Sequence, residues 1–280
     1  MWGMKLFDLL KGAIAALFVT VGASVFVAPQ VNAQSFDRTV QADILPGWRA
    51  ADGTIIAALR IRLNPGWKTY WRAPGDAGIP PTITWRGSRN LSGAQISWPV
   101  PHVFDQNGMR SIGYKDELIL PLRLAPKTSG APIKLRAQLD IGVCRDICVP
   151  QTLKVSAELP ATLTKPVPAI AAALASVPYS SKEAGVKSAT CRISPTSEGV
   201  RVTAKVTMPS SGGTEVVVIE TANPEVWVAE AQSTRQGNTL TASAEMIHQD
   251  GDSFLIDRAG LRITVLGHSH AVDIQGCTAG

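Results

Sequence analysis

The sequence has few charged and few aromatic residues, and it lacks any run of basic residues. Charged residues make up 18% and aromatic residues 6% of its 280 positions, whereas hydrophobic residues make up 45%. A chain this apolar and weakly charged does not belong to the disordered class. The net charge of +5 is spread along the chain, so we expect no nucleic-acid partner. Gly-x-Gly-x-x-Gly and Walker patterns are also missing, so no motif indicates a nucleotide site.

One long apolar stretch is present, at residues 12–28. Two lysines precede it, and Val-Asn-Ala at 31–33 ends it with small residues at the positions that a signal peptidase reads. We therefore predict a cleavable signal peptide at residues 1–33, with a retained membrane anchor as the alternative. No later stretch approaches the ~20 apolar residues that a spanning helix needs. The prediction places the mature chain in the periplasm, where disulfides persist.

Prolines mark a seam in the mature chain. Four of them fall between positions 160 and 178, around an alanine-rich segment at 169–175 that is long enough for at most two turns of helix. We predict a first domain at 34–160, a Pro/Ala-rich linker at 161–185 and a second domain at 186–280. Each domain is long enough to bury a core of its own.

Both domains have the sequence pattern of β-strands. Apolar side chains alternate along residues 55–63, as in a half-buried strand. Many short strands with regular turn signals and almost no helical periodicity predict an all-β protein with two β-sandwich domains. The other predicted strands cover residues 82–85, 94–98, 118–124, 133–139 and 152–158 in the first domain, and 200–206, 214–220, 226–230, 239–247 and 261–266 in the second.

The four cysteines fall into two pairs. Cys191 and Cys277 lie near the two ends of the second domain, which predicts a structural disulfide that ties its first and last strands together. Cys144 and Cys148 lie only four residues apart. They would face each other, within reach of a disulfide, if the residues between them formed a tight reversal.

Three interpretations of the close pair compete. It is a redox-active pair, a structural hairpin disulfide or half of a metal site. A ring this short constrains the unfolded chain weakly and can be reduced easily, which favours the redox interpretation. A third and a fourth ligand at zinc-finger spacing are missing, which disfavours the metal site.

Three segments resemble the N-terminal periplasmic region of the DsbD/ScsB family of thiol:disulfide interchange proteins, and the ScsB-like branch in particular. They read GWKTYWRAPGDAGIPP at 66–81, GYKDEL at 113–118 and GVCRDICVP at 142–150. The resemblance implies an immunoglobulin-like sandwich that carries a redox-active pair, here Cys144 and Cys148. It also implies that Cys148 forms the mixed disulfide with a partner and that Cys144 resolves it.

The resemblance also implies an activity and its partners. We expect a thiol-disulfide oxidoreductase of the protein-disulfide reductase type, which needs no bound cofactor because the electrons travel as thiols. Its electrons would come from a membrane-embedded thiol protein and go to periplasmic thioredoxin-like or disulfide-isomerase proteins. Family members continue into a membrane domain and a thioredoxin-like domain, so we expect separate proteins to fill those roles here.

A cap over the close pair is a further expectation from the family. The corresponding segment is HVFDQNGMR at 102–110, in which Phe104 and Asp105 are the expected cap residues, with Tyr114 as a further partner contact. We expect residues 101–113 to form a flexible covering loop, with Gly108 and Gly113 as its hinges.

Copper binding is the chief rival function, because the ScsB-like branch is associated with copper tolerance. Cys144 and Cys148 could bind copper together with Met109, or with His268 and His270 if these lie on one face of a strand. We expect no metal site, and we keep copper as the alternative, beside an adaptor whose disulfides are all structural. Five of the seven tryptophans fall between 48 and 98, where we expect core packing rather than a docking face.

Overall fold

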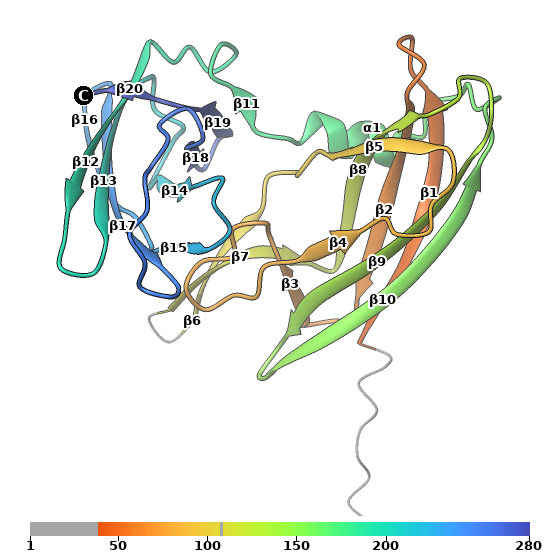
Figure 1. Ribbon diagram of the computed structural model, residues 1–280, viewed down its shortest axis with the longest axis horizontal. Helices are drawn as coiled ribbons and strands as arrows, with labels where there is room; N and C mark the ends of the chain where they lie inside the picture. The colour runs from red at the N-terminus through yellow and green to blue at the C-terminus, as the bar shows by residue number, and fades with distance from the viewer. Residues whose placement is uncertain (1–38, 107–108) are drawn as a thin grey trace, which may run out of the picture. The chain divides into compact units, whose positions relative to one another are not determined.

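The computed structural model describes residues 39–106 and 109–280, and the predicted signal peptide at 1–33 lies outside them. The described residues belong to one compact unit. They form four β-sheets and one short helix (Figure 1). Within this part of the chain, no helix has the length and apolar character needed to cross a membrane.

Two sheets make up the first half of the described chain. The first sheet has the strand order β1 (Val40–Arg49), β2 (Ile55–Leu63), β8 (Glu117–Pro126) and β5 (Leu91–Ile96). The second sheet has the order β10 (Cys148–Leu159), β9 (Ile133–Cys144), β3 (Lys68–Tyr70), β7 (Met109–Lys115) and β6 (His102–Gln106), and β4 (Thr82–Thr84) also pairs with β9. Buried side chains from both sheets share one hydrophobic core, which makes this half a β-sandwich.

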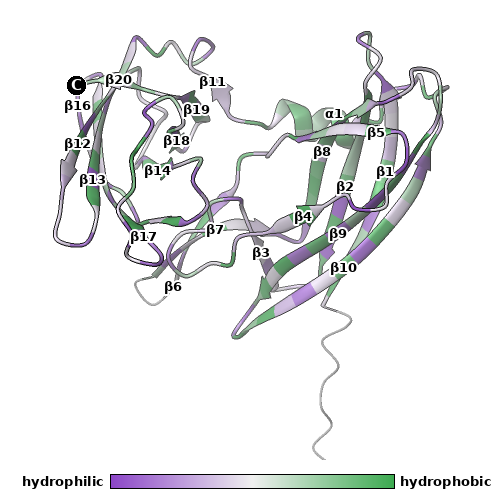
Figure 2. Cartoon of the chain, in the orientation of Figure 1, coloured by the Kyte–Doolittle hydropathy of each residue, from purple (hydrophilic) through white to green (hydrophobic). Residues whose placement is uncertain are grey.

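The long hairpin of β9 and β10 illustrates why these residues form strands. Its two strands pair antiparallel from Cys144–Cys148 at one end to Ile133–Leu159 at the other. Along β9 the side chains at 133, 135, 137 and 139 are buried and the alternate ones are more exposed. Hydrophobic and hydrophilic residues accordingly alternate in bands along this hairpin (Figure 2). This period of two presents one face of the sheet to the core.

The second half has the same plan. One sheet has the order β11 (Tyr179–Ser180), β19 (Ala271–Gln275), β18 (Arg262–Leu266) and β14 (Val216–Glu220). The other has the order β15 (Val226–Val228), β17 (Thr239–His248), β13 (Val200–Thr207), β12 (Ser188–Pro195) and β20 (Thr278–Ala279), and β16 (Gln232–Gln236) also pairs with β17. A second hydrophobic core lies between these sheets.

Helix α1 (Pro168–Ala175) lies between the two halves in sequence and packs on the outer face of the first sheet. Its Ile170 is fully buried against Ile56 and Ala58 of β2. Residues 55–59 of β2 are therefore buried on both faces, whereas the alternation predicted a half-buried strand. The difference arises because α1 covers the face that the pattern assigned to solvent.

The prediction of an all-β protein with two sandwiches is confirmed. Every strand predicted from the sequence exists, with shifted ends. The division into separate domains at 160 and 186 stays a prediction. Trp67 and Trp71 are buried, and Trp48, Trp85 and Trp98 pack partly buried against the hydrophobic clusters, so the tryptophan-rich region serves packing as expected.

Candidate redox site

The close cysteine pair lies at the tip of the longest hairpin. Cys144 ends β9 and Cys148 begins β10, and the two residues are paired across the hairpin with their Cα atoms 4.1 Å apart. Residues 145–147 make the reversal, in which the backbone N–H of Arg145 donates to the carbonyl of Ile147. A disulfide joins the two sulfurs. Residues 145–147 therefore form the tight reversal that facing cysteines at this spacing require.

The two cysteine residues differ in their exposure to solvent. Cys144 is only 1% exposed, because it follows the buried Val143 in β9 and pairs with the buried Lys68 of β3. Cys148 is an exposed residue, at the beginning of an edge strand. A partner that approaches the hairpin can therefore reach Cys148 and not Cys144, a difference that matters for thiol exchange because the rate depends on access.

The Tyr70 side chain contacts both sulfurs. Its hydroxyl oxygen lies 2.9 Å from Cys144 Sγ and 3.2 Å from Cys148 Sγ. Disulfide sulfurs carry no hydrogen, so the hydroxyl is the donor, and the two sulfurs share its one proton with the carbonyl of Ala77 at 3.4 Å. Burial raises the pKa of Tyr70 above its usual value, so the hydroxyl stays protonated at neutral pH.

The local sequence makes room for this tyrosine. β3 pairs with β9 next to the cysteine, with Thr69 opposite Val143, and the Thr69 hydroxyl donates to the carbonyl of Gly142. A Cβ atom on Gly142 would lie 3.0 Å from the Tyr70 ring, so glycine at this position leaves space for the ring. Tyr70 belongs to the family-like segment at 66–81, but the sequence does not predict its role at the sulfurs. Only the pairing of β3 with β9, more than seventy positions apart, brings Tyr70 to the sulfurs.

Replacing Tyr70 by Phe is expected to make the reduced pair less reactive. The hydroxyl would donate to the thiolate and stabilise it, so its loss raises the pKa of the attacking thiol. We expect alkylation of reduced Cys148 at neutral pH to slow about fivefold, the effect of losing one hydrogen bond. Tyr114→Phe is the matched control, because that buried hydroxyl donates to the carbonyl of Pro99 instead. Equal rates in the two variants would contradict the role of Tyr70.

Charged side chains surround the hairpin tip. The Lys68 ammonium donates to the Ser111 hydroxyl at 3.1 Å, and burial lowers the pKa of this lysine. Arg145 and Asp146 form an ion pair with each other at 2.9 Å, so their opposing effects on a thiolate offset locally. The guanidinium of Arg145 also lies over the ring of Trp67, 5.5 Å from its centre.

The segment expected to form a covering loop is instead a β-hairpin, in which β6 pairs with β7. Gly108, expected as a hinge, lies outside the described residues. Gly113 is not a hinge but a strand residue, at a point where a Cβ atom would collide with the carbonyl oxygen of Thr69. The close approach of β3 and β7 therefore explains this glycine.

The residues expected to form the cap or to contact a partner differ in burial and in their contacts. Phe104 is partly buried, with its ring 5.0 Å from Lys68 Nζ, and so lies next to the residue that pairs with Cys144. Asp105 is exposed, and its carboxylate lies 3.6 Å from Arg110 Nε. The expectation that Tyr114 contacts a partner is wrong, because this residue is 5% exposed and belongs to the core.

The second cysteine pair forms a disulfide of a different kind. Cys191 in β12 is fully buried and bonds to Cys277, which lies between β19 and β20, with their Cα atoms 5.8 Å apart. The bond joins positions 86 residues apart near the two ends of the second half. Its purely structural role stays a prediction.

The ligands considered for copper do not gather in one place. Among the described residues, no group of three or more His, Cys, Asp or Glu side chains could hold a metal ion. His268 and His270 lie in the turn between β18 and β19, not on one face of a strand, and the His270 ring lies 5.4 Å from that of Tyr179. The expected pairing of the two imidazoles on a strand is therefore wrong.

Comparisons with known proteins match this geometry. The family described as "Thiol:disulfide interchange protein DsbD, N-terminal" matches residues 41–160, which include the Cys144–Cys148 hairpin. No curated protein matches the chain. The crystal structure of the N-terminal periplasmic domain of ScsB from Proteus mirabilis has 22% sequence identity and a TM-score of 0.62, covering 86% of this chain and 92% of that one, and it shows the same fold.

A second solved structure is less similar. The reduced N-terminal domain of DsbD from Neisseria meningitidis has 16% identity and a TM-score of 0.24, over 42% of this chain and 84% of that one. The hairpin disulfide lies inside the family match. Residues 41–160 of this chain match the family of DsbD N-terminal domains.

Proposed function

We propose that this protein is a periplasmic thiol:disulfide interchange protein of the reductase type, which works through Cys144 and Cys148. The observation that carries the proposal is the hairpin disulfide between one exposed and one buried cysteine, with both sulfurs in contact with the Tyr70 hydroxyl. The family description, thiol:disulfide interchange, supports it. The periplasmic location of the similar ScsB domain supports the compartment, as does the predicted signal peptide.

The exchange begins with both cysteines reduced. The Cys148 thiolate attacks one sulfur of a partner's disulfide, whose S–S bond breaks, and one partner sulfur leaves as a thiolate. Cys144 then loses its proton and attacks Cys148 Sγ, which releases the second partner sulfur. The partner gains two electrons and two protons, and Cys144 and Cys148 become the disulfide.

The geometry supports this assignment of roles. Cys148 is the sulfur that a protein partner can reach, whereas the buried Cys144 can attack only a sulfur that is already held at position 148. The two residues are paired across the hairpin, so the resolving step requires no large backbone movement. Tyr70 lies close enough to donate to whichever sulfur carries negative charge.

The partners follow from this chemistry. A membrane-embedded protein with a reactive dithiol would reduce the pair again, by the same two exchange steps in reverse. The acceptors would be periplasmic thioredoxin-like or disulfide-isomerase proteins, whose disulfides are exposed enough to be attacked. The cycle requires no bound cofactor, since every electron travels as a thiol.

The test uses the full mature chain with Cys144 and Cys148 reduced. Mixed with an oxidised thioredoxin-like protein, it should reduce that partner while its own pair becomes oxidised, as intact mass and thiol labelling would record. Absence of exchange with several such partners would contradict the proposal. Absence of exchange together with stoichiometric binding of copper(I) by the reduced chain would favour the copper-binding alternative.

Phe104→Ala is expected to expose the reactive pair. The Phe104 ring lies 5.0 Å from Lys68 Nζ, and Lys68 pairs with Cys144, so the ring would shield this side of the hairpin tip. We expect reduced Cys148 to react several-fold faster with a small alkylating reagent, while circular dichroism stays unchanged because the ring is only partly buried. An unchanged rate in a folded variant would show that Phe104 does not act as a cap, and global unfolding would assign it to the core.

A further inference from the structure

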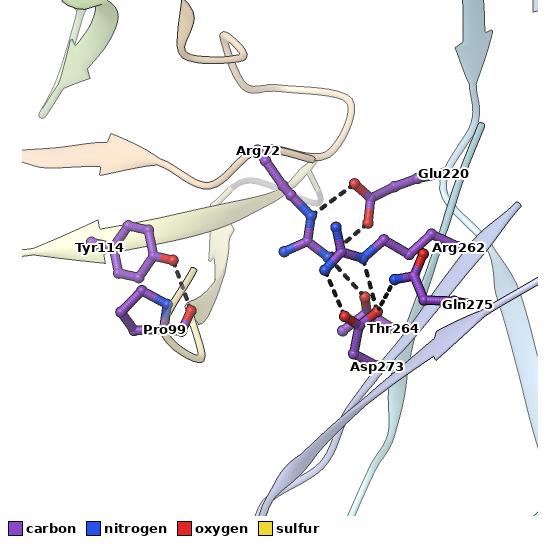
Figure 3. A network of polar contacts seen from close by, with 8 residues as sticks. All are labelled: Arg72, Pro99, Tyr114, Glu220, Arg262, Thr264, Asp273 and Gln275. Carbon is purple, nitrogen blue, oxygen red and sulfur yellow. Dashed lines mark hydrogen bonds and ion pairs between the residues drawn. The ribbon is translucent and has the colours of Figure 1, made fainter. Parts of the chain in front are cut away.

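A partly buried ion pair joins the second half of the chain to the segment that directly follows the strand of Tyr70. Arg72 follows Tyr70 by two residues, and its Nε and Nη2 atoms each donate to the Glu220 carboxylate of β14 at 3.0 Å. Nη2 also donates to the Thr264 hydroxyl of β18 at 3.1 Å (Figure 3). The geometry is bidentate, which fixes the direction of the arginine side chain as well as its position.

The surroundings of this pair make it costly to break. The side chains of Arg72 and Glu220 are only 12% and 20% exposed. Burial lowers the pKa of Arg72, and the charge of Arg262 nearby acts in the same direction, although Asp273 holds Arg262 in an ion pair of its own (Figure 3). Removing Glu220 would therefore leave a buried guanidinium without its carboxylate, a strongly unfavourable state.

A second ion pair joins the same half to the hairpin of β6 and β7, here called the cap hairpin. Arg110 of β7 contacts the Glu230 carboxylate, with both side chains 28% exposed, and its Nε lies 3.6 Å from Asp105. β7 lies between β6 and β3, so that its Ser111 pairs with Phe104 and its Gly113 pairs with Tyr70. Arg110 therefore connects Glu230 to the strand that carries Phe104.

The backbone between the two arginines is tied together. The Trp71 N–H donates to the Ile112 carbonyl at 2.9 Å, and the Ile112 N–H donates to the Pro74 carbonyl at 2.8 Å. A Cβ atom on Gly75 would lie 2.8 Å from the carbonyl oxygen of Arg110, so the chain after β3 lies directly on β7. Arg72 lies two residues after Tyr70, and Arg110 pairs with Asp105, the neighbour of Phe104. A displacement of Arg72 would therefore move Tyr70, and a displacement of Arg110 would move Phe104.

From these contacts we infer that Glu220 and Glu230 are positioning residues for exchange at Cys144 and Cys148. Glu220 acts through Arg72 and holds Tyr70 against the sulfurs, whereas Glu230 acts through Arg110 and holds the cap hairpin in place. The second half thereby sets the reactivity of the cysteine pair in the first half. This inference rests on the proposed exchange function.

The test separates positioning from simple stabilisation of the fold. The full chain carries Glu220→Gln or Glu230→Gln, and Glu245→Gln is the matched control, since Glu245 pairs with Arg201 on the exposed surface of the second half. The readouts are the thiol pKa of Cys148, from the pH dependence of its alkylation rate, and the exchange rate with an oxidised thioredoxin-like protein. Both quantities are measured under conditions in which circular dichroism shows that each variant is folded.

Two results are expected. Glu220→Gln should raise the thiol pKa and slow exchange about fivefold, as Tyr70→Phe does, and the double variant should be no slower than Tyr70→Phe alone. Glu230→Gln should speed alkylation several-fold, as Phe104→Ala does. The variant that carries both of these substitutions should react no faster than Phe104→Ala alone. Such non-additivity shows that each pair of residues acts through one contact.

Other outcomes overturn the inference. The ion pairs would serve only the fold if the Glu220→Gln and Glu230→Gln variants had the same thiol pKa values and rates as Glu245→Gln. Effects that add in the double variants would lead to the same conclusion. If Glu220→Gln does not fold, Glu230→Gln and Glu220→Asp decide in the same way. A parent chain without any exchange activity would instead contradict the proposed function itself, which keeps the two failures apart.

Discussion

A Cys144→Ala variant is expected to accumulate disulfide-linked adducts with its partners through Cys148. The exposed Cys148 can still attack a partner's disulfide, but no second thiol remains to resolve the mixed disulfide. Expressed in periplasm and trapped with acid, the variant should migrate as one or more larger species that disappear on reduction. Mass spectrometry of those species would identify the partners.

The reverse variant supplies the control. Cys148→Ala leaves only Cys144, which is 1% exposed and covered by its neighbours in β9 and β3, so few adducts are expected. The ratio of adducts between the two variants should be large, because attack requires direct access to the sulfur. Adducts that form mainly through Cys144 would reverse the roles assigned to the two sulfurs, and adducts in neither variant would argue against exchange.

Removing the two disulfides is expected to destabilise the fold to very different degrees. The Cys191–Cys277 bond spans 86 positions, and in the chain-entropy model closing such a loop contributes about 4.5 kcal/mol. The Cys144–Cys148 bond spans four positions, for which the same model gives roughly 2 kcal/mol. Urea unfolding of the two double Cys→Ala variants would compare these losses in the free energy of unfolding.

The same contrast predicts an order of reduction. Cys191 is fully buried, whereas Cys148 lies at an exposed hairpin tip, so a mild dithiol should reduce the Cys144–Cys148 bond while the other bond stays intact. Alkylation followed by mass mapping of the labelled cysteines would record the order. Labelling of Cys191 and Cys277 first, or a larger loss of stability without the Cys144–Cys148 bond, would contradict the division into a redox and a structural disulfide.

The sequence pattern predicts strands whose burial alternates, such as β13 and β17, and it also predicts β2, whose residues 55–59 are buried on both faces. β1 was missed because Pro46 and Gly47 interrupt its pattern, and the structure places a β-bulge between Pro46 and Trp48. The pattern predicts a loop in place of the β6–β7 hairpin because Gly and polar residues dominate its middle. In both segments the pairing partner, rather than local propensity, stabilises the strand.

The candidate site shows a similar division. A spacing of four residues permits facing cysteines without requiring them, because they meet only where the chain between them reverses tightly, as it does at residues 145–147. The contact of Tyr70 with Cys144 joins residues 74 positions apart, and the Arg72–Glu220 ion pair joins residues 148 positions apart. Such contacts depend on which strands pair and how the sheets pack, which the local sequence does not determine. Tyr114, expected at a partner surface, is buried because β7 lies inside its sheet, between β3 and β6.

The midpoint potential of the Cys144–Cys148 bond tests the central claim most directly. The full chain would be equilibrated with dithiol buffers of known potential, and the reduced fraction of each pair read by alkylation and mass mapping. The redox function predicts a potential above about −300 mV for this pair, where exchange with other proteins is reversible. A pair that stays oxidised well below that potential, as structural disulfides do, would contradict the claim.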